Sequence, residues 1–248
     1  MPHRTLRIAT LNIHKGVSPL NARLLLHEQR ELIRRLHADI VFLQEVRGGG
    51  QHHRHVISTT QHEFLADTVW PEFAYGKNSV YPGGHHGNAI LSKHPITRWE
   101  NEDISANPAE QRGMLHCEIN IPGWDQPLHC ICIHLGLFAR WRKKQLMAVR
   151  DRIDAMVPKE APLIIAGDFN DWRQKAGNFL HDKQLREVFE HVSGSPARSF
   201  PSILPLLRLD RIYTRGFHIQ HAEVHTGKQG VPVSDHAALS ATLTRDLR

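Results

Sequence analysis

Cysteine is scarce in this chain, and its scarcity excludes a fold stapled by disulfide bonds. The three cysteines, Cys117, Cys130 and Cys132, are an odd number and fall inside predicted strands, whereas disulfide-rich proteins place paired cysteines at loop spacings. Because alternate residues share one face of a strand, Cys130, Cys132 and His134 together admit a soft-metal site. No fourth ligand is evident, so buried thiols acting as small apolar side chains are the favoured interpretation. We expect a reducing compartment.

Long apolar runs are also missing. No stretch approaches the ~20 apolar residues that a membrane-spanning helix requires, so no transmembrane segment is expected. The first residues, Met1 to Thr5, lead directly into a predicted strand and leave no room for the apolar core of a secretory signal. A cytoplasmic location is therefore expected.

Several catalytic motifs are absent as well. Ser234 lacks the Gly-x-Ser-x-Gly turn that positions a serine nucleophile. Gly48-Gly49-Gly50 matches neither a phosphate-binding loop nor a dinucleotide-binding turn, and the His-Glu-x-x-His spacing of zinc proteases does not occur. These absences disfavour serine hydrolase, nucleotide-binding and zinc protease chemistry.

The charge balance favours anionic partners. Lysine and arginine number 31 against 25 aspartates and glutamates, a formal net charge of +6, which suits nucleic acid, phospholipid head groups or phosphorylated metabolites. The chain also has 20 histidines. Two clusters, His52-His53-x-His55 and His85-His86, lie in glycine-rich segments and are interpreted as solvated loop residues.

The hydrophobic pattern predicts many short strands and two helices. Amphipathic helices are expected over 21–37 and 139–157, with a loop over 48–63. Strands are expected at 6–11, 40–43, 89–92, 114–121, 128–134, 163–166, 211–213, 219–224 and 238–243. Their irregular alternation with helices favours a β-sandwich with helices outside over a parallel α/β sheet. No linker, repeat or composition break divides the 248 residues, so a single domain spanning 1–248 is expected.

Polar residues follow the ends of many of these strands. An unpaired carboxylate at the edge of a core is costly, so acids that recur at strand ends are usually paired, solvated or bound to a metal. We expect the strands to bring eight such side chains to one region, as the ligands and bases of an enzyme. They are Asn12, Glu45, His134, Asp168, Asn170, Asp210, Asp235 and His236.

Oxygen donors in this set suit a hard cation such as Mg²⁺, which one or two carboxylates usually hold. Glu45 is the first choice of ligand. Asn12 offers an amide oxygen nearby, and Asp235 offers a second carboxylate that binds directly or through water.

The remaining residues suit hydrolysis at phosphorus, which needs an activated water and stabilisation of charge. His236 can accept a proton if Asp210 orients its ring. Asp168 and Asn170 lie two residues apart, so an extended segment would point both the same way, one toward water and the other toward a phosphoryl oxygen. His134 remains for the phosphate or the leaving group.

Seven segments resemble, in sequence order, the endonuclease/exonuclease/phosphatase superfamily. They are Thr10-Leu11-Asn12-Ile13, residues 39–46, residues 87–92, His134-Leu135, Gly167-Asp168-Phe169-Asn170, residues 209–212 and Ser234-Asp235-His236. Each motif is weak alone, but seven in order are specific. Residues 12–16, 81–89 and 167–175 resemble in particular the bacterial YbhP-type branch of the superfamily.

The resemblance implies an α/β (α+β) fold: a four-layer αββα sandwich with two mixed, mostly antiparallel sheets face to face between helices. It also implies Mg²⁺- or Mn²⁺-dependent phosphoester hydrolysis. By motif position, Glu45 becomes the metal ligand with Asn12 beside it, and His236 with Asp210 becomes the base pair. Asp168 and Asn170 take the nucleophile and transition-state positions, and His134 becomes a catalytic group on the phosphate side.

The same resemblance places Arg112 and Asn88 at the substrate phosphate. The alternative for Arg112 is a surface arginine before a strand. No helical insertion of the kind that abasic-site enzymes use to grip DNA is evident, which speaks against a DNA-repair role.

The substrate stays open between nucleic acid and a phospholipid or small phosphoester. Arg140-Trp141-Arg142-Lys143-Lys144 places cations at a predicted helix start, where they oppose the helix dipole. This segment suits a nucleic-acid backbone or a peripheral contact with an anionic membrane, and equally a solvated basic face. A non-catalytic binding module is the alternative of a different class, and the presence of Glu45, Asp168 and His236 disfavours it. We expect a monomer.

Overall fold

The computed structural model describes residues 5–18, 23–48, 60–67, 69–82, 84–226 and 232–245. Its strands form two six-stranded sheets. The first sheet has the order β11 (His218–His225), β12 (Ala238–Thr244), β1 (Thr5–Asn12), β2 (Ile40–Gly48), β4 (Gly84–Ser92) and β3 (Glu72–Tyr81). The second has the order β5 (Ile96–Asp103), β6 (Gly113–Ile119), β7 (Leu128–His134), β8 (Leu163–Asp168), β10 (Asp210–Arg215) and β9 (Arg186–Glu187).

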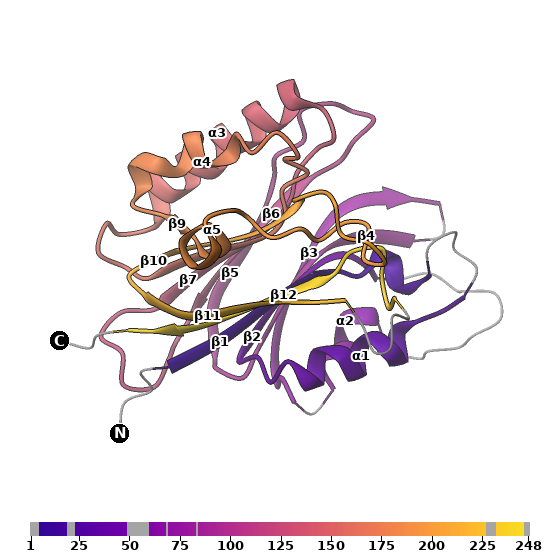
Figure 1. The fold of residues 1–248 in the computed structure, drawn as a ribbon, viewed down its shortest axis with the longest axis horizontal. Helices are drawn as coiled ribbons and strands as arrows, with labels where there is room; N and C mark the ends of the chain where they lie inside the picture. Colours follow the sequence, from indigo (N-terminus) through magenta and orange to yellow (C-terminus); the bar gives the residue numbers. More distant parts are fainter. Residues whose placement is uncertain are drawn as a thin grey trace.

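Both sheets are mixed and mostly antiparallel, as the resemblance implied. Among the strands described, β1 pairs in parallel with β2 and β7 with β8, while the other neighbours are antiparallel. Helices α1 (Leu26–Arg35) and α2 (Gln61–Ala66) lie on the first sheet; α3 (Ala139–Met156) and α4 (Ala176–Leu180) lie on the second (Figure 1). The short helix α5 (Val188–Ser193) follows β9, and 3-10 turns η1 (His14–Gly16) and η3 (His181–Lys183) complete the described elements.

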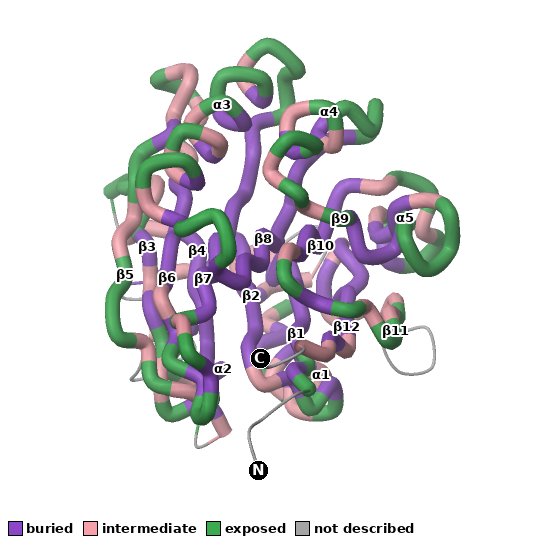
Figure 2. The backbone as a smooth tube through the Cα atoms, turned by 90° about the vertical axis from the view of Figure 1, so that its left-hand side faces the viewer, coloured by how far each residue is buried: buried purple, intermediate pink, exposed green. Residues whose placement is uncertain are grey.

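Three apolar cores separate these four layers. The central core lies between the sheets and includes Ile8 and Phe42 from one and Ile164 and Ile212 from the other. A second core packs α1 and α2 on the first sheet, and a third packs α3 and α4 on the second. Strand β7 therefore has both faces covered, which explains why all its residues are buried. Figure 2 shows buried strands inside and exposed helical surfaces outside.

The hydrophobic pattern missed three edge strands, β3, β5 and the two-residue β9. Most residues of β5 are exposed or half-buried, and β3 carries polar residues such as Lys77 and Asn78. Edge strands with little buried surface lack the apolar alternation that marks a strand in sequence.

Two expected local structures differ from those observed. The first helix begins at Leu26 and not near Asn21, because Leu24 pairs with Val17 in a β-bridge. Part of the expected loop 48–63 is the start of α2, whose capping box joins Thr60 to Glu63. Gly48 belongs to β2, and residues 49–59, with His52, His53 and His55, lie outside the described residues.

His85 and His86 do not lie in a solvated loop. Both belong to β4 and pair with β2 and β3. The Nδ1 of His85 lies 2.9 Å from the hydroxyl of Tyr75, and burial lowers the pKa of His86.

The cysteines behave as core side chains, as interpreted from the sequence. All three are free, buried and part of the central core. Burial raises the pKa of Cys132 to about 12 against the hydrogen bond from Gln44, whose Nε2 lies 3.3 Å from the sulfur. None of the helices described is long and apolar enough to cross a membrane.

Candidate active site

The second sheet ends in a row of three ionisable residues. His134 is in register with Asp168 across the parallel β7–β8 ladder, and Asp168 with Asp210 across the antiparallel β8–β10 ladder. Because neighbouring strands lie about 5 Å apart, the three side chains meet at one sheet edge. All three are buried, so each needs a partner to compensate for lost hydration.

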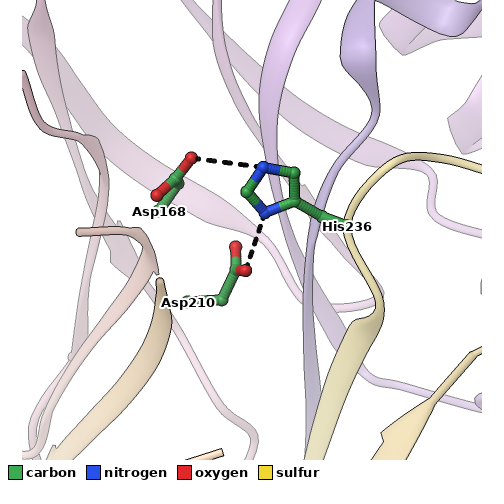
Figure 3. Close-up of side chains that lie close together, drawn as sticks. All are labelled: Asp168, Asp210 and His236. Carbon is green, nitrogen blue, oxygen red and sulfur yellow. Dashed lines mark hydrogen bonds and ion pairs between the residues drawn. The ribbon is translucent and has the colours of Figure 1, made fainter. Parts of the chain in front are cut away.

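His236 joins this row from the first sheet. It precedes β12 and is held by Ser234, whose Oγ accepts from the His236 N–H at 3.3 Å and donates to the carbonyl of Asn12 at 2.6 Å. The His236 Nδ1 lies 2.8 Å from Asp210 Oδ2, and its Nε2 lies 3.7 Å from Asp168 Oδ2 (Figure 3). The imidazole therefore stands between two carboxylates of the opposite sheet.

The surroundings shift the pKa values of this group in useful directions. Burial opposes charge on His236, but the negative charges of Asp210 and then Asp168 outweigh it and raise the pKa of His236. Burial raises the pKa of Asp168, against the opposing effect of His236. His236 can therefore act as a base only above its raised pKa, and Asp168 accepts a proton more readily than an exposed aspartate.

Asn12 and Glu45 form the neighbouring part of the site. Glu45 lies at a β-bulge of β2 and has a left-handed backbone, with φ of 56°, a conformation that non-glycine residues seldom adopt and that redirects a side chain. The Asn12 Nδ2 donates to Glu45 Oε1 at 3.3 Å and to Asp168 Oδ2 at 3.2 Å. Asn12 therefore connects the base region to Glu45.

The amide oxygen of Asn12 points away from both carboxylates and accepts from the His14 N–H at 3.0 Å. Its direct binding to a metal would require this amide to turn. The predicted metal role of Asn12 thus stays a prediction, and what the structure shows is a hydrogen bond to the other predicted ligand, Glu45.

Two residues of η1 approach the predicted metal ligands. His14 Nδ1 lies 3.2 Å from Asp235 Oδ2, and Lys15 Nζ lies 3.9 Å from Glu45 Oε2. The hydrogen bond to Asp235 raises the pKa of His14. Burial opposes the charge of Asp235, but the contact with His14 and the charge of His236 hold the pKa of Asp235 below its ordinary value. Residues 12–16 carry part of the sequence resemblance, but no role was predicted for His14 or Lys15.

A cavity of about 290 Å³ opens beside these groups. Its lining includes Lys15, Glu45, His86, Glu110, Arg112 and His134. Arg112 is mostly buried: its Nη2 lies 3.0 Å from Glu110 Oε1, and its Nε donates to the carbonyl of Leu135 at 3.3 Å. Arg112 therefore lies in the cavity lining, and its contact with a substrate phosphate stays a prediction. Glu110 and His86 were not among the predicted site residues.

His134 lies between the cavity and the base region. Its Nε2 is 3.5 Å from Asp168 Oδ2. Burial, with help from the positive charge of Arg112, lowers the pKa of His134 well below its ordinary value. A neutral ring at this position can both donate and accept a hydrogen bond.

Asn170 does not extend beside Asp168 in the way the two-residue spacing predicted. Its backbone is left-handed, with φ of 49°, so the chain turns sharply after β8. Its N–H donates to Asp168 Oδ1 at 2.9 Å, and its side-chain Nδ2 donates to the carbonyl of Leu135 at 2.9 Å. In this arrangement Asn170 fixes Asp168 in place. Its contact with a phosphoryl oxygen stays a prediction.

Asn88 lies away from the cavity lining and ties the two sheets together. Its Nδ2 donates to the carbonyls of Gly113 at 3.0 Å and Cys132 at 3.3 Å, and the side chain is buried. Both amide hydrogens are thereby occupied, and the predicted contact of Asn88 with the substrate phosphate stays a prediction.

Buried polar residues that the sequence did not single out hold the loop after Asp168. Asp171 Oδ2 accepts from the Ala176 N–H at 2.6 Å. Arg211 donates to the carbonyls of Asp171 at 3.3 Å and Asp210 at 3.1 Å. The sequence signal that could have identified Asp171 and Arg211 is their position close to the predicted catalytic residues Asp168 and Asp210.

Two sets of residues could hold a divalent cation. Asp168, Asp210 and His236 are the one group among the described residues whose ligand atoms lie within 4.8 Å of one another. In that group the His236 Nδ1 is engaged with Asp210 at 2.8 Å, so the ring could bind an ion only through Nε2, which the proposed base also uses. Glu45 is half-buried and faces the cavity, so its carboxylate fits a hard cation that retains water and binds phosphate.

Comparisons with known proteins identify the family and the fold of this chain. Residues 9–236 match the Endonuclease/Exonuclease/phosphatase family. YbhP of Escherichia coli K12 is 45% identical over 252 residues, covering 98% of this chain and 99% of that protein. Among solved structures, an endonuclease/exonuclease/phosphatase from Beutenbergia cavernae has a TM-score of 0.84 at 20% identity, covering 98% of this chain and 72% of that one. A humanized TDP2 of D. rerio has a TM-score of 0.73 at 22% identity, covering 97% and 99%. The chain therefore belongs to the endonuclease/exonuclease/phosphatase family, and within it resembles YbhP over nearly its whole length.

Proposed function

We propose that this protein is a divalent-metal-dependent phosphoester hydrolase, a phosphodiesterase or phosphatase. One observation carries the proposal: the Asp210–His236–Asp168 array lies beside a cavity whose lining includes Glu45, Lys15, Arg112 and His134. The array offers proton acceptors, and the cavity offers both an acidic cation ligand and positive charge for a phosphate. Hydrolysis at phosphorus requires all of these functions.

His236 is the proposed base that takes a proton from the attacking water. Asp210 fixes the ring through Nδ1, which leaves Nε2 facing Asp168 and available for proton transfer. The two carboxylates stabilise the imidazolium that forms. Asp168 can share this work, because its burial raises its affinity for a proton.

Charge stabilisation is assigned to the cavity side. Lys15, Arg112 and His134 lie where they can donate to phosphoryl oxygens or to the leaving group. A Mg²⁺ or Mn²⁺ ion held by Glu45, with Asp235 directly or through water, would neutralise phosphate charge. The residues present fit such an ion because Glu45 supplies the hard oxygen donor at the cavity.

We also propose that residues 1–248 act as one catalytic domain and as a monomer. Strand β1 pairs with β12 and so joins the two ends of the described chain in one sheet. Site residues come from both sheets, so the site requires both sheets to be folded.

The test is hydrolysis of a panel of phosphomonoesters and phosphodiesters with Mg²⁺ or Mn²⁺. The wild type is compared with Asp168→Asn and His236→Ala, and with His191→Ala at an exposed position. We expect the wild type to hydrolyse at least one class of phosphoester. Both site variants should lose this activity, and the control variant should keep it. Equal activity in the wild type and the site variants would exclude a catalytic role for Asp168 and His236. No turnover, together with no binding of either ion by calorimetry, would favour the non-catalytic module.

A further inference from the structure

Three loops at one edge of the second sheet expose large apolar side chains. They follow His134 on β7, follow Asp168 on β8 and precede Asp210 on β10. Their exposed fractions lie between 41% and 71%, which is unusual for so many large apolar residues in neighbouring loops. The residues are Leu137, Phe138, Trp172, Ile203, Leu204, Leu206 and Leu207. We name this surface the apolar rim.

The three loops lie side by side because their strands, β7, β8 and β10, are neighbours in the second sheet. Backbone pairing continues past the strand ends, with the Leu135 N–H donating to Asp168 at 2.8 Å and the Phe169 N–H to Leu209 at 2.9 Å. Side chains also connect the first two loops. The Arg142 guanidinium stacks 5.1 Å from the Trp172 ring centre.

The loop over residues 200–207 is held firmly while its apolar side chains face solvent. Phe200 and Leu207 pair in a β-bridge that closes the loop. The Ser202 N–H donates to the carbonyl of Asp235 at 2.7 Å, and the Phe200 ring lies 5.0 Å from that of His236. Exposure of Ile203 and Leu204 is therefore built into a loop that is fastened to the candidate active site.

Charge on the apolar rim has one sign. The described segments 137–144, 171–175 and 200–208 contain a single acidic residue, Asp171, and it is buried. Exposed cations stand among the apolar residues, and four of them, Arg140, Lys143, Arg173 and Lys175, line a cavity of about 380 Å³ with Leu146 and Phe179 on its apolar side. The buried Asp171 also lines this cavity, so the cations outnumber the single carboxylate. An anion with an apolar body suits such a lining.

We propose that the apolar rim docks on an anionic phospholipid membrane. Aliphatic tips with cations around them match the layered structure of a bilayer surface, with apolar side chains below the head groups and lysine or arginine at their level. A nucleic acid would make use of the cations but not of Ile203, Leu204, Leu206 and Leu207, because bases stack on aromatic and not aliphatic side chains.

Docking would face the catalytic cavity toward the head-group layer, since the rim loops extend from the strands that carry His134, Asp168 and Asp210. The substrate class that follows is a phosphoester exposed at a membrane surface. This choice of substrate rests on the proposed hydrolase function, whereas the docking itself does not.

Sedimentation with lipid vesicles tests the docking. The full chain is mixed with vesicles of equal parts phosphatidylglycerol and phosphatidylcholine, or of phosphatidylcholine alone. We expect binding to the anionic vesicles and at least tenfold weaker binding to the neutral ones. The double variant Ile203→Asp, Leu204→Asp should bind at least tenfold more weakly. The double variant Trp99→Asp, Val192→Asp is the control; it makes the same charge change at exposed apolar sites outside the rim and should bind within twofold of wild type.

Several outcomes would overturn the docking proposal. One is that the wild type does not sediment with anionic vesicles. Another is that the two double variants lose vesicle binding to the same extent. Binding that needs Arg140 and Lys143 but not Ile203 and Leu204 would also overturn it, since it would show attraction to any polyanion.

The proposed hydrolase function is judged separately. His236→Ala should keep vesicle binding while losing hydrolysis. If the protein binds vesicles but hydrolyses no phosphoester, the docking proposal is supported and the hydrolase proposal is excluded. If it hydrolyses a phosphoester but does not bind vesicles, the hydrolase proposal is supported and the docking proposal is excluded.

Discussion

His236 Nδ1 lies 2.8 Å from Asp210 Oδ2, a contact between a segment before β12 and the first residue of β10. It joins the two sheets at their polar edge. The two residues are 26 positions apart in sequence, and the fold alone brings them together. Because a carboxylate both orients an imidazole and stabilises its protonated form, this pair should govern the activity.

Asp210→Asn should reduce turnover about 10²- to 10⁴-fold, the usual contribution of a positioned base. The amide keeps the shape of the aspartate but removes the negative charge that stabilises imidazolium. The measurement is kcat on whichever phosphoester the wild type hydrolyses, with Asp182→Asn, at an exposed position, as the control. If Asp210→Asn turns over at the wild-type rate, Asp210 does not act through His236.

Glu45→Gln should weaken Mn²⁺ binding by at least about tenfold, because loss of a charged oxygen ligand removes most of a hard-cation site. Asp210→Asn should bind Mn²⁺ about as the wild type does. Titration calorimetry on both variants separates the two candidate sets of ligands. The opposite pattern, with binding lost only in Asp210→Asn, would place the ion in the Asp168, Asp210 and His236 cluster.

The sequence predicted central elements better than edge elements. Strand β7 has the bounds expected from its apolar run, since both its faces are covered and every residue is buried. Strand β5 was missed because it is an edge strand with most of its residues exposed or half-buried. The capping box of Thr60 and Glu63 was readable in sequence but lay in a segment otherwise without periodicity.

The candidate site was predictable as a set of residues and not as a geometry. Strand-end polarity identified His134, Asp168 and Asp210, which the structure places in one row. The orientation of Asn170 depends on a left-handed backbone that spacing cannot reveal. The contact of His14 with Asp235 joins the two ends of the chain, and no local pattern encodes it.

Gly167→Ala should destabilise the fold by about 2–4 kcal/mol and disturb Asp168, the next residue. Gly167 has φ of 146°, and a Cβ there would meet the carbonyl oxygen of Ile133 at 2.0 Å. That oxygen is backbone of the neighbouring strand and cannot move aside alone. Gly177→Ala is the control, since its Cβ would meet only Tyr213 Oη at 3.9 Å. Denaturant unfolding checks both, and equal stabilities would contradict the close approach.

Glu187→Gln should stabilise the protein above neutral pH. Burial raises the pKa of Glu187 to about 7 from 4.5, against the hydrogen bond from Glu190. The folded state therefore holds an extra proton between these values, and stability falls as pH rises through this window, by about 3 kcal/mol in total. Glutamine keeps an acceptor for the Glu190 N–H without the charge. The stability difference between variant and wild type should grow from pH 5 to pH 8, while exposed Glu160→Gln should show a flat difference.

His116→Gln should make the protein less sensitive to acid. Burial, followed by neighbouring His129, lowers the pKa of His116 to about 3 from 6.5. The Arg152 Nε donates to His116 Nδ1 at 3.1 Å, and His116 Nε2 lies 3.0 Å from His129 Nδ1, so the ring is held neutral. A lowered folded-state pKa contributes stability that is complete above pH 6.5 and is lost as pH falls toward 3, on the order of 5 kcal/mol. Unfolding free energies measured from pH 7 to pH 4 should fall less steeply in His116→Gln than in wild type, with exposed His191→Gln matching wild type. Parallel curves for His116→Gln and wild type would show that this ring does not take up a proton on unfolding.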